Sequence, residues 1–305
     1  MEEFNNPPAA TFLVMFALCT ILASAISVML NAAAAAIDFP SENHSTPLRW
    51  RLLGLASLVL FWSLVGYLYV REPEVAIVIL AGYFIVVMAL GGQITGELGI
   101  ISQRAQRTLP KTFIGRVFLT WLFPGAGFGY IYLICLYAAL ALTLSVINIT
   151  NNGRLSIAGT SYLLLCYLII YVGINRLLML AVPRTTTARS LASISMLIVV
   201  LIMAHLVPWV VTYYLNDYND FPYGWHQAFN IYLTVAELND RFSPQIGVST
   251  TILTLCALVI FGLNLVLCSR DVMLVRVTAP PRVRLEDEAA AATIQSASPV
   301  DPFAD

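Results

Sequence analysis

The stretch LASISMLIVVLIMAHLVPWVVTY, residues 191–213, contains no Asp, Glu, Lys or Arg. A helix that crosses a bilayer needs about 20 apolar residues, because each residue adds about 1.5 Å and the hydrocarbon core is about 30 Å thick. Backbone groups must be satisfied internally in lipid, which leaves a helix or a closed β-barrel. The stretch lacks the polar alternation of a barrel strand, so it predicts a membrane-spanning helix.

Six further apolar runs flank this stretch, and together they predict spans at about residues 11–31, 52–70, 75–94, 125–147, 156–176, 191–213 and 249–268. The composition agrees, since 11% of the residues are charged, against about 25% in soluble domains. We therefore predict an all-α polytopic transmembrane bundle of about seven spans, forming one domain over residues 1–283. Residues 284–305 have too little apolar surface to offset their ordering entropy, which predicts a disordered cytoplasmic tail.

The cations between the runs fall mainly on one side. If the loop 104–116 is cytoplasmic, only Arg71, Arg154 and Arg241 of the 16 Lys and Arg residues lie outside. The inside cations are then Arg49, Arg51, Arg104, Arg107, Lys111, Arg116, Arg176, Arg184, Arg189, Arg270, Arg276, Arg282 and Arg284. Because this bias sets membrane orientation, we expect the amino terminus outside and the carboxyl terminus inside, in a bacterial inner membrane.

The scarcity of charge argues against several kinds of chemistry. No Asp or Glu interrupts a predicted span, so His205 lacks partners for a proton relay and is interpreted as a hydrogen-bonded packing residue. The five cysteines lie in apolar runs without metal-ligand spacing, and HExxH and GxSxG motifs are missing. No basic stripe suggests nucleic acid. We predict a protein that is not an enzyme and binds no cofactor or metal.

The predicted inside segment 97–124 is the first candidate for function. Apolar residues recur at helical spacing over 97–109, and a second amphipathic stretch covers 113–119. The sequence PGAGFGY at 124–130 then breaks or kinks the chain and lets backbones approach closely. The segment is either a coupling element or a plain interface anchor. Its candidate residues are Arg104, Arg107, Lys111, Arg116, Pro124, Gly125, Gly127 and Gly129.

The predicted outside segment 214–248 is the second candidate. Aromatic and acidic residues interleave over 214–226, a mixture that suits either a binding site or the headgroup interface. Apolar residues at helical spacing from Phe229 to Ala236 predict an amphipathic helix that lies on the outer surface as a lid or anchor. The candidate binding residues are Asp217, Tyr218, Asp220, Tyr223, Trp225 and His226.

Residues 107–116, RTLPKTFIGR, and 119–130, LTWLFPGAGFGY, resemble a stretch in bacterial multi-pass proteins related to, or encoded beside, type-two ABC exporter permeases. Those permeases have an even number of spans with both termini inside, whereas seven spans are predicted here. The resemblance therefore implies an accessory or incomplete transmembrane subunit.

Two functions follow as expectations. The first is a transmembrane subunit of an ABC-exporter-type transport complex, embedded in the lipid bilayer, whose segment 97–124 meets a cytoplasmic ATPase or other transmembrane subunits. The energy would come from that partner, because the chain carries no nucleotide motif. The alternative is a non-catalytic membrane scaffold or sensor that recognises a ligand through the outer aromatic segment 214–248.

Overall fold

A computed structural model describes residues 7–37, 45–69, 73–97, 112–122, 125–152, 156–183, 189–215, 223–240, 244–274 and 289. These residues form helices and turns, with no strand among them. Seven of the helices are long and apolar enough to cross a membrane. The predicted all-α fold with seven spans is therefore confirmed, and the chain is an integral membrane protein. The predicted tail lies outside the described residues apart from Ala289.

The long helices extend beyond the apolar runs that predicted them, because flanking polar residues continue the helical backbone. They are α1 (Pro7–Ile37), α2 (Ser45–Tyr69), α3 (Pro73–Gly96), α6 (Ala126–Asn152), α7 (Ser156–Met179), α8 (Arg189–Leu215) and α10 (Pro244–Leu274). Among the described residues, three short helices lie between them, namely α5 (Phe113–Thr120), the 3₁₀ turn η2 (Trp225–Gln227) and α9 (Ile231–Asp240).

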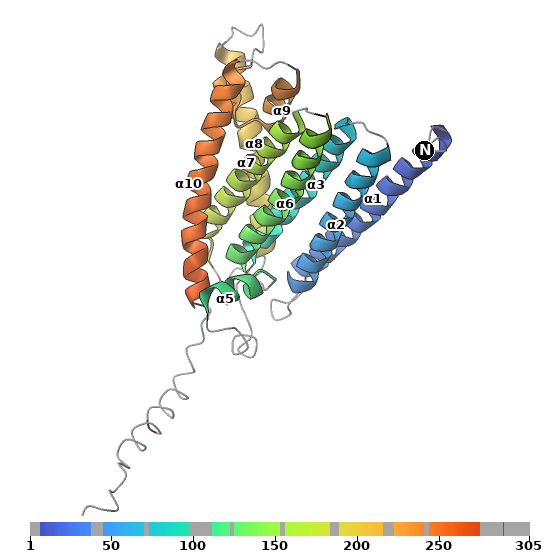
Figure 1. Ribbon diagram of the computed structural model, residues 1–305. Coiled ribbons are helices and arrows are strands. Elements are labelled where there is room, and N and C mark those ends of the chain that lie inside the picture. The colour runs from blue at the N-terminus through green and yellow to red at the C-terminus, as the bar shows by residue number, and fades with distance from the viewer. Residues whose placement is uncertain are drawn as a thin grey trace, which may run out of the picture.

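The bundle has two distinct ends. Figure 1 shows α5 at the lower end, beside the last turn of α10, and α9 at the upper end. We call these the α5 end and the α9 end. The cation distribution predicts that the α5 end faces the cytoplasm.

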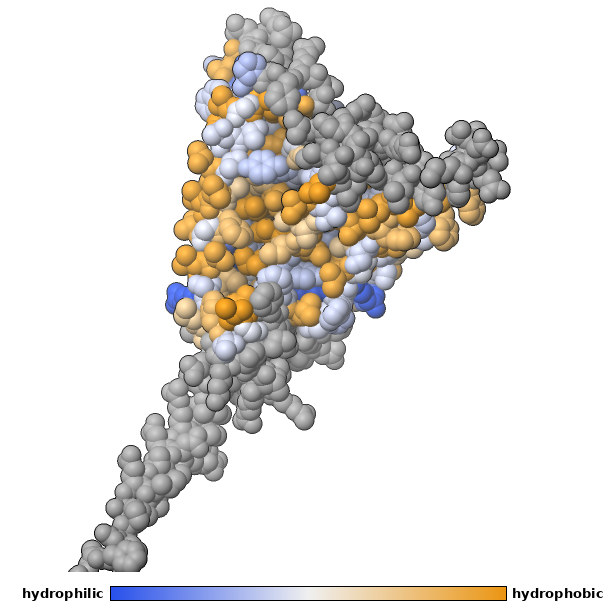
Figure 2. Space-filling view, in the orientation of Figure 1, coloured by the Kyte–Doolittle hydropathy of each residue, from blue (hydrophilic) through white to orange (hydrophobic). Residues whose placement is uncertain are grey.

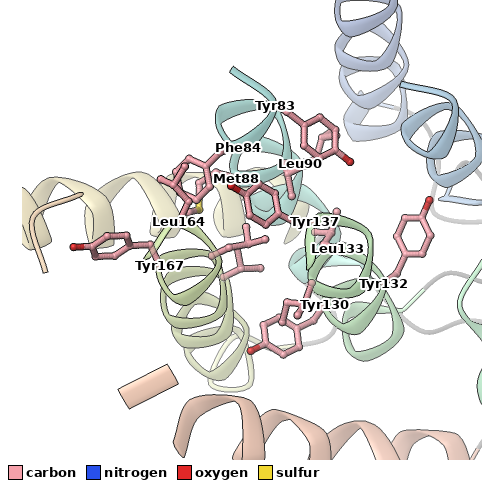
Figure 3. Packing of buried hydrophobic residues seen from close by; sticks show 14 of the residues in the cluster. Tyr83, Phe84, Met88, Leu90, Tyr130, Tyr132, Leu133, Tyr137, Leu164 and Tyr167 are labelled. Carbon is pink, nitrogen blue, oxygen red and sulfur yellow. The ribbon is translucent and has the colours of Figure 1, made fainter. Parts of the chain in front are cut away.

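Aromatic side chains fill the centre of the bundle. Tyr83 of α3 stacks on Tyr137 of α6 with ring centroids 6.1 Å apart, and Phe84 meets the same ring edge-on at 6.0 Å. Figure 3 shows these rings gathered between the two helices. Tyr167 and Tyr171 continue the buried aromatic surface along α7, which is the most enclosed of the long helices.

Three helices face outward along most of their length. Few residues of α1, α8 and α10 are buried, and their exposed side chains are mainly large and apolar. Figure 2 shows this apolar surface as a broad band across the middle of the molecule. Such a band has the composition of a surface that contacts acyl chains.

Candidate functional site

A buried arginine gathers four segments at the α5 end. Arg49, in the first turns of α2, has a fully buried side chain. Its Nη2 donates to Oε2 of Glu97, just after α3, at 2.9 Å. Its Nη1 donates to the carbonyl of Trp121, after α5, at 2.6 Å, and its Nη2 reaches the carbonyl of Gly125 at 3.2 Å. One guanidinium group thus connects α2, α3, α5 and the start of α6.

Glu97 also binds the amino-terminal end of α6. The backbone N–H of Gly125 donates to Oε2 of Glu97 at 3.4 Å. A carboxylate is favourable there, because the first N–H groups of a helix lack partners and carry partial positive charge. Gly125 has a φ of 143°, which a residue with a side chain rarely adopts. The glycine allows this conformation just before α6, where its peptide contacts both charged groups.

A second buried arginine lies on the other side of α6. Arg176 of α7 is 3% exposed, and its Nη1 donates to the backbone and side-chain carbonyls of Asn264 on α10 at 2.8 and 3.0 Å. Its Nη2 pairs with Oδ2 of Asp271 at 3.1 Å. An arginine near the end of a membrane span often snorkels to the interface. In the structure Arg176 is held between two helices instead, because α10 continues past its apolar run and brings Asp271 within reach.

The alternate glycines of α6 let this helix start between the two arginines. A methyl group at Gly127 would lie 2.8 Å from both Arg176 Nη2 and Asp271 Oδ2. A methyl group at Gly129 would overlap Ile94 and come within 2.9 Å of Arg49 Nη2. We call Arg49, Glu97, Arg176, Asp271 and residues 125–129 the arginine clamp.

Both arginines of the clamp are compensated by their surroundings. A buried guanidinium costs several kcal/mol unless it is paired and hydrogen-bonded, and both arginines meet that condition. Thr46 adds a bond from α2 by donating to the carbonyl of Leu122 at 2.8 Å. These bonds join the residues that follow α5 to α2, and Arg49 extends the connection to the end of α3 and the start of α6.

The predicted coupling residues divide between the clamp and parts of the chain outside the described residues. Gly125, Gly127 and Gly129 lie in the clamp. Arg116 belongs to α5, with its side chain outside the description. Outside the described residues lie Arg104, Arg107, Lys111 and Pro124.

Sequence reasoning missed the charged members of the clamp. Arg49 and Arg176 were counted only as topology signals, and the pairing of Glu97 and Asp271 was not foreseen. The signal that could have found them is one opposite charge near the inside end of a neighbouring span, since an ionisable group close to the hydrocarbon needs a partner.

At the α9 end, two of the predicted binding residues hold the chain in place. His226 Nε2 lies 2.7 Å from Oγ1 of Thr212 on α8, and Gln227 donates to the same oxygen at 2.7 Å. Tyr223 donates to Oγ1 of Thr234 at 3.1 Å. Trp225 differs, because it is 64% exposed with its ring edge-on to His226. The other candidates, Asp217, Tyr218 and Asp220, lie outside the described residues.

The predicted amphipathic helix exists as α9, which packs against α7 on one side and leaves Tyr232 76% exposed on another. Its last turn packs on α7, where a methyl group at Gly159 would lie 3.1 Å from Leu238. The preceding turn is bound further along α7, since Tyr167 donates to the carbonyl of Ala228 and Tyr171 to that of Phe229. Phe229, Val235 and Leu238 pack against the buried core of the bundle. We call residues 223–240 the α9 hairpin.

His205 lies close to this hairpin on α8. Its Nδ1 is 2.7 Å from the carbonyl of Leu201, and its own carbonyl accepts a bond from Asn230 at 3.5 Å. This placement agrees with a packing role.

Comparisons with protein-family models, with curated protein sequences and with solved structures gave no match to this chain. The clamp and the hairpin are therefore the basis on which function is inferred.

Proposed function

We propose that this protein is a transmembrane subunit of an ABC-exporter-type transport complex, and that α5 with the arginine clamp couples a cytoplasmic ATPase to the bundle. The observation that carries the proposal is the bonding of Arg49. Its guanidinium group binds carbonyls on both sides of the α5–α6 turn and a carboxylate at the end of α3. Force applied to α5 by a partner would therefore reach α2, α3 and α6 together.

The exposed part of α5 is suited to a contact at the membrane surface. Phe113 and Ile114 are exposed, whereas Thr120 at the other end of the helix is buried against the bundle. The sequence that precedes α5 carries Arg104, Arg107 and Lys111. An apolar pair beside basic residues fits a partner with an acidic, partly apolar docking surface.

The first experiment identifies the partner. The tagged full-length chain is extracted in a mild detergent, and the co-purifying proteins are identified by mass spectrometry. The proposal expects an ATPase and ATP hydrolysis by the purified complex. Recovery of the chain alone, or only with further copies of itself, would contradict it.

The second experiment tests the coupling. Replacing Gly127 by Ala places a methyl group 2.8 Å from both Arg176 Nη2 and Asp271 Oδ2. We expect membrane insertion and ATPase association to persist, while the bundle no longer alters the hydrolysis rate of its partner. The matched control is Gly262→Ala on α10, where nothing lies within 4 Å of the added methyl group. Equal hydrolysis rates for both variants and the parent would contradict a coupling role.

A membrane scaffold or sensor is the second candidate, and the exposure of Trp225 favours it. An indole that is 64% exposed at a helix-bundle end is available for recognition. This function predicts that Trp225→Ala abolishes the cellular phenotype while Gly127→Ala is tolerated. The transport function predicts the opposite order.

A further inference from the structure

The α9 hairpin enters the bundle from the α9 end. Asn230, at its deepest turn, donates to the carbonyl of His205 on α8. Leu215, the last residue of α8, follows His205 by ten residues, so this contact lies about 15 Å from the end of that helix. From there α9 runs back outward, and Leu238 meets Gly159 near the start of α7.

Non-helical backbone at such a depth is unusual. It is tolerated in membrane proteins where it is buried in protein or lines a water-filled path, and broken helices often mark the substrate sites of transporters. Here the turn is buried, since Ala228 and Gln227 are 0% and 1% exposed. Its N–H groups are satisfied by tight turns such as Gln227 N–H to the carbonyl of Gly224 at 2.9 Å.

Hydrogen bonds, rather than ion pairs, attach the hairpin to the surrounding helices in the described part of the chain. Tyr167 and Tyr171 bind two of its carbonyls, and Thr212 binds His226 and Gln227. The two ion pairs found in the described part of the chain both lie at the α5 end. Single neutral bonds contribute about 1 kcal/mol each, so this attachment can be exchanged for water more easily than a buried ion pair.

The helices beside the hairpin carry buried hydroxyl groups without a partner. Thr160 of α7 is 1% exposed and Ser249 of α10 is 0% exposed, and neither hydroxyl has a hydrogen-bond partner among the described residues. This is unusual for a helix, because such hydroxyls commonly donate to a carbonyl one turn earlier, as Thr250 does to Ile246 at 2.7 Å. Thr160 precedes Tyr167 by seven residues, so it shares the face of α7 that binds the hairpin.

We infer that the α9 hairpin is the gate of a substrate pathway between α7, α8 and α10, and that the pathway carries an uncharged molecule with hydroxyl or amide groups. When the hairpin withdraws, the hydroxyls of Tyr167 and Tyr171 lose their partners and join Thr160 as a polar wall. Thr212 loses its bonds to the hairpin and keeps the bond that it donates to the carbonyl of Pro208. This wall carries no formal charge, and moving an ion past uncharged groups at this depth is costly. The gate presupposes the transport function proposed above.

The test follows the accessibility of single cysteines in the purified ATPase complex, with the five native cysteines replaced by alanine. Ala228→Cys reports on the buried turn and Trp225→Cys on an exposed neighbour. Leu253→Cys, on a residue of α10 that is 0% exposed, is the buried control. Each is labelled with a neutral methanethiosulfonate and with its trimethylammonium and sulfonate analogues, at rest and during ATP hydrolysis.

We expect Ala228→Cys to react about tenfold faster during hydrolysis, because labelling follows the population of the open state. After normalisation to the rate at Trp225→Cys, the labelling rate of the neutral reagent should rise more than the rate of either charged analogue. Leu253→Cys should stay unreactive.

An unchanged labelling rate at Ala228→Cys, in a complex whose ATP hydrolysis still responds to Gly127→Ala, would overturn the gate alone. Equal increases in labelling rate for all three reagents would overturn the inference that the substrate is uncharged. A chain that purifies without an ATPase would overturn the transport function and the gate with it.

A cross-link provides a second measurement. Gly159 and Leu238 face each other, with Leu238 Cγ 3.8 Å from the position of a methyl group at Gly159. The double variant Gly159→Cys/Leu238→Cys, oxidised, should lose the tenfold gain at Ala228→Cys and recover it on reduction. Labelling that accelerates equally in the oxidised and reduced proteins would overturn the gate.

Discussion

At the α5 end, Arg49 binds the start of α6 and Arg176 joins α7 to α10, and both buried arginines are paired with carboxylates. At the α9 end, hydroxyl, amide, imidazole and carbonyl groups hold the α9 hairpin, with no ion pair among the described residues. A buried ion pair is costly to separate, because each charge then remains in a medium that solvates it poorly. Replacing a neutral hydrogen bond by a bond to water costs less free energy. This difference suits the α5 end to moving as one unit, and it suits the α9 end to releasing the α9 hairpin.

Removing the guanidinium group of Arg49 is expected to have the largest effect on the difference between the two ends. Arg49→Ala leaves Glu97, with a side chain 12% exposed, unpaired beside the carbonyls of Trp121 and Gly125. We expect a loss of about 3–5 kcal/mol in stability, measured as a large drop in the thermal unfolding temperature in detergent.

Arg51→Ala is the control for this change. Arg51 is an exposed neighbour with a single bond of 3.2 Å to Ser27, and its loss should change the unfolding temperature little. If both substitutions lowered the unfolding temperature equally, Arg49 would contribute no more to stability than an exposed arginine. The double variant Arg49→Met/Glu97→Leu should recover part of the loss, since removing both charges leaves none unpaired.

The next effect concerns the close approach of α6 to α3. Gly129→Ala drives a methyl group into Ile94, and overpacking of this kind costs about 1–3 kcal/mol. Gly82→Ala, on α3, meets nothing within 4 Å and should leave stability equal or slightly higher, because alanine favours a helix by about 1 kcal/mol over glycine. Thermal unfolding of the two variants side by side measures the difference. If Gly129→Ala were as stable as Gly82→Ala, the packing of the clamp would be looser than its geometry indicates.

These positions show what sequence reasoning reached and what it did not. Seven spans followed from apolar runs, because the length and polarity of each run are local properties. The glycines at 125–129 were recognised as a site of close approach, but their neighbours were not, because Ile94 and Arg176 lie far away in the sequence. The α9 helix was predicted from its periodicity and assigned to the surface. Its apolar stripe does not reveal whether lipid or protein covers it.

A smaller and local effect is expected at the hairpin. Tyr171→Phe removes the donor to the carbonyl of Phe229, which costs about 1 kcal/mol. Because this bond attaches a segment rather than a spanning helix, the change should appear mainly as local opening. We expect faster hydrogen exchange over residues 223–240 with little change in the unfolding temperature. The matched control is Tyr162→Phe, which removes an exposed bond to Thr254 on α10 and should leave exchange in the hairpin unchanged. A fall in the unfolding temperature as large as that of Gly129→Ala would mean that the hairpin is an integral part of the bundle.

The smallest effect is expected at the outer member of the clamp. Asp271 is 47% exposed, so its pair with Arg176 is screened by solvent and contributes about 0–1 kcal/mol. Asp271→Asn should therefore lower the unfolding temperature only slightly, and high salt should reduce the difference further. Arg176 would remain bound to both carbonyls of Asn264, which are buried. A large loss in Asp271→Asn would show that the carboxylate, rather than Asn264, compensates the charge of Arg176. Both arginines of the clamp would then depend on a carboxylate partner. The α5 end would differ from the hydrogen-bonded α9 end more strongly than the exposure of Asp271 implies.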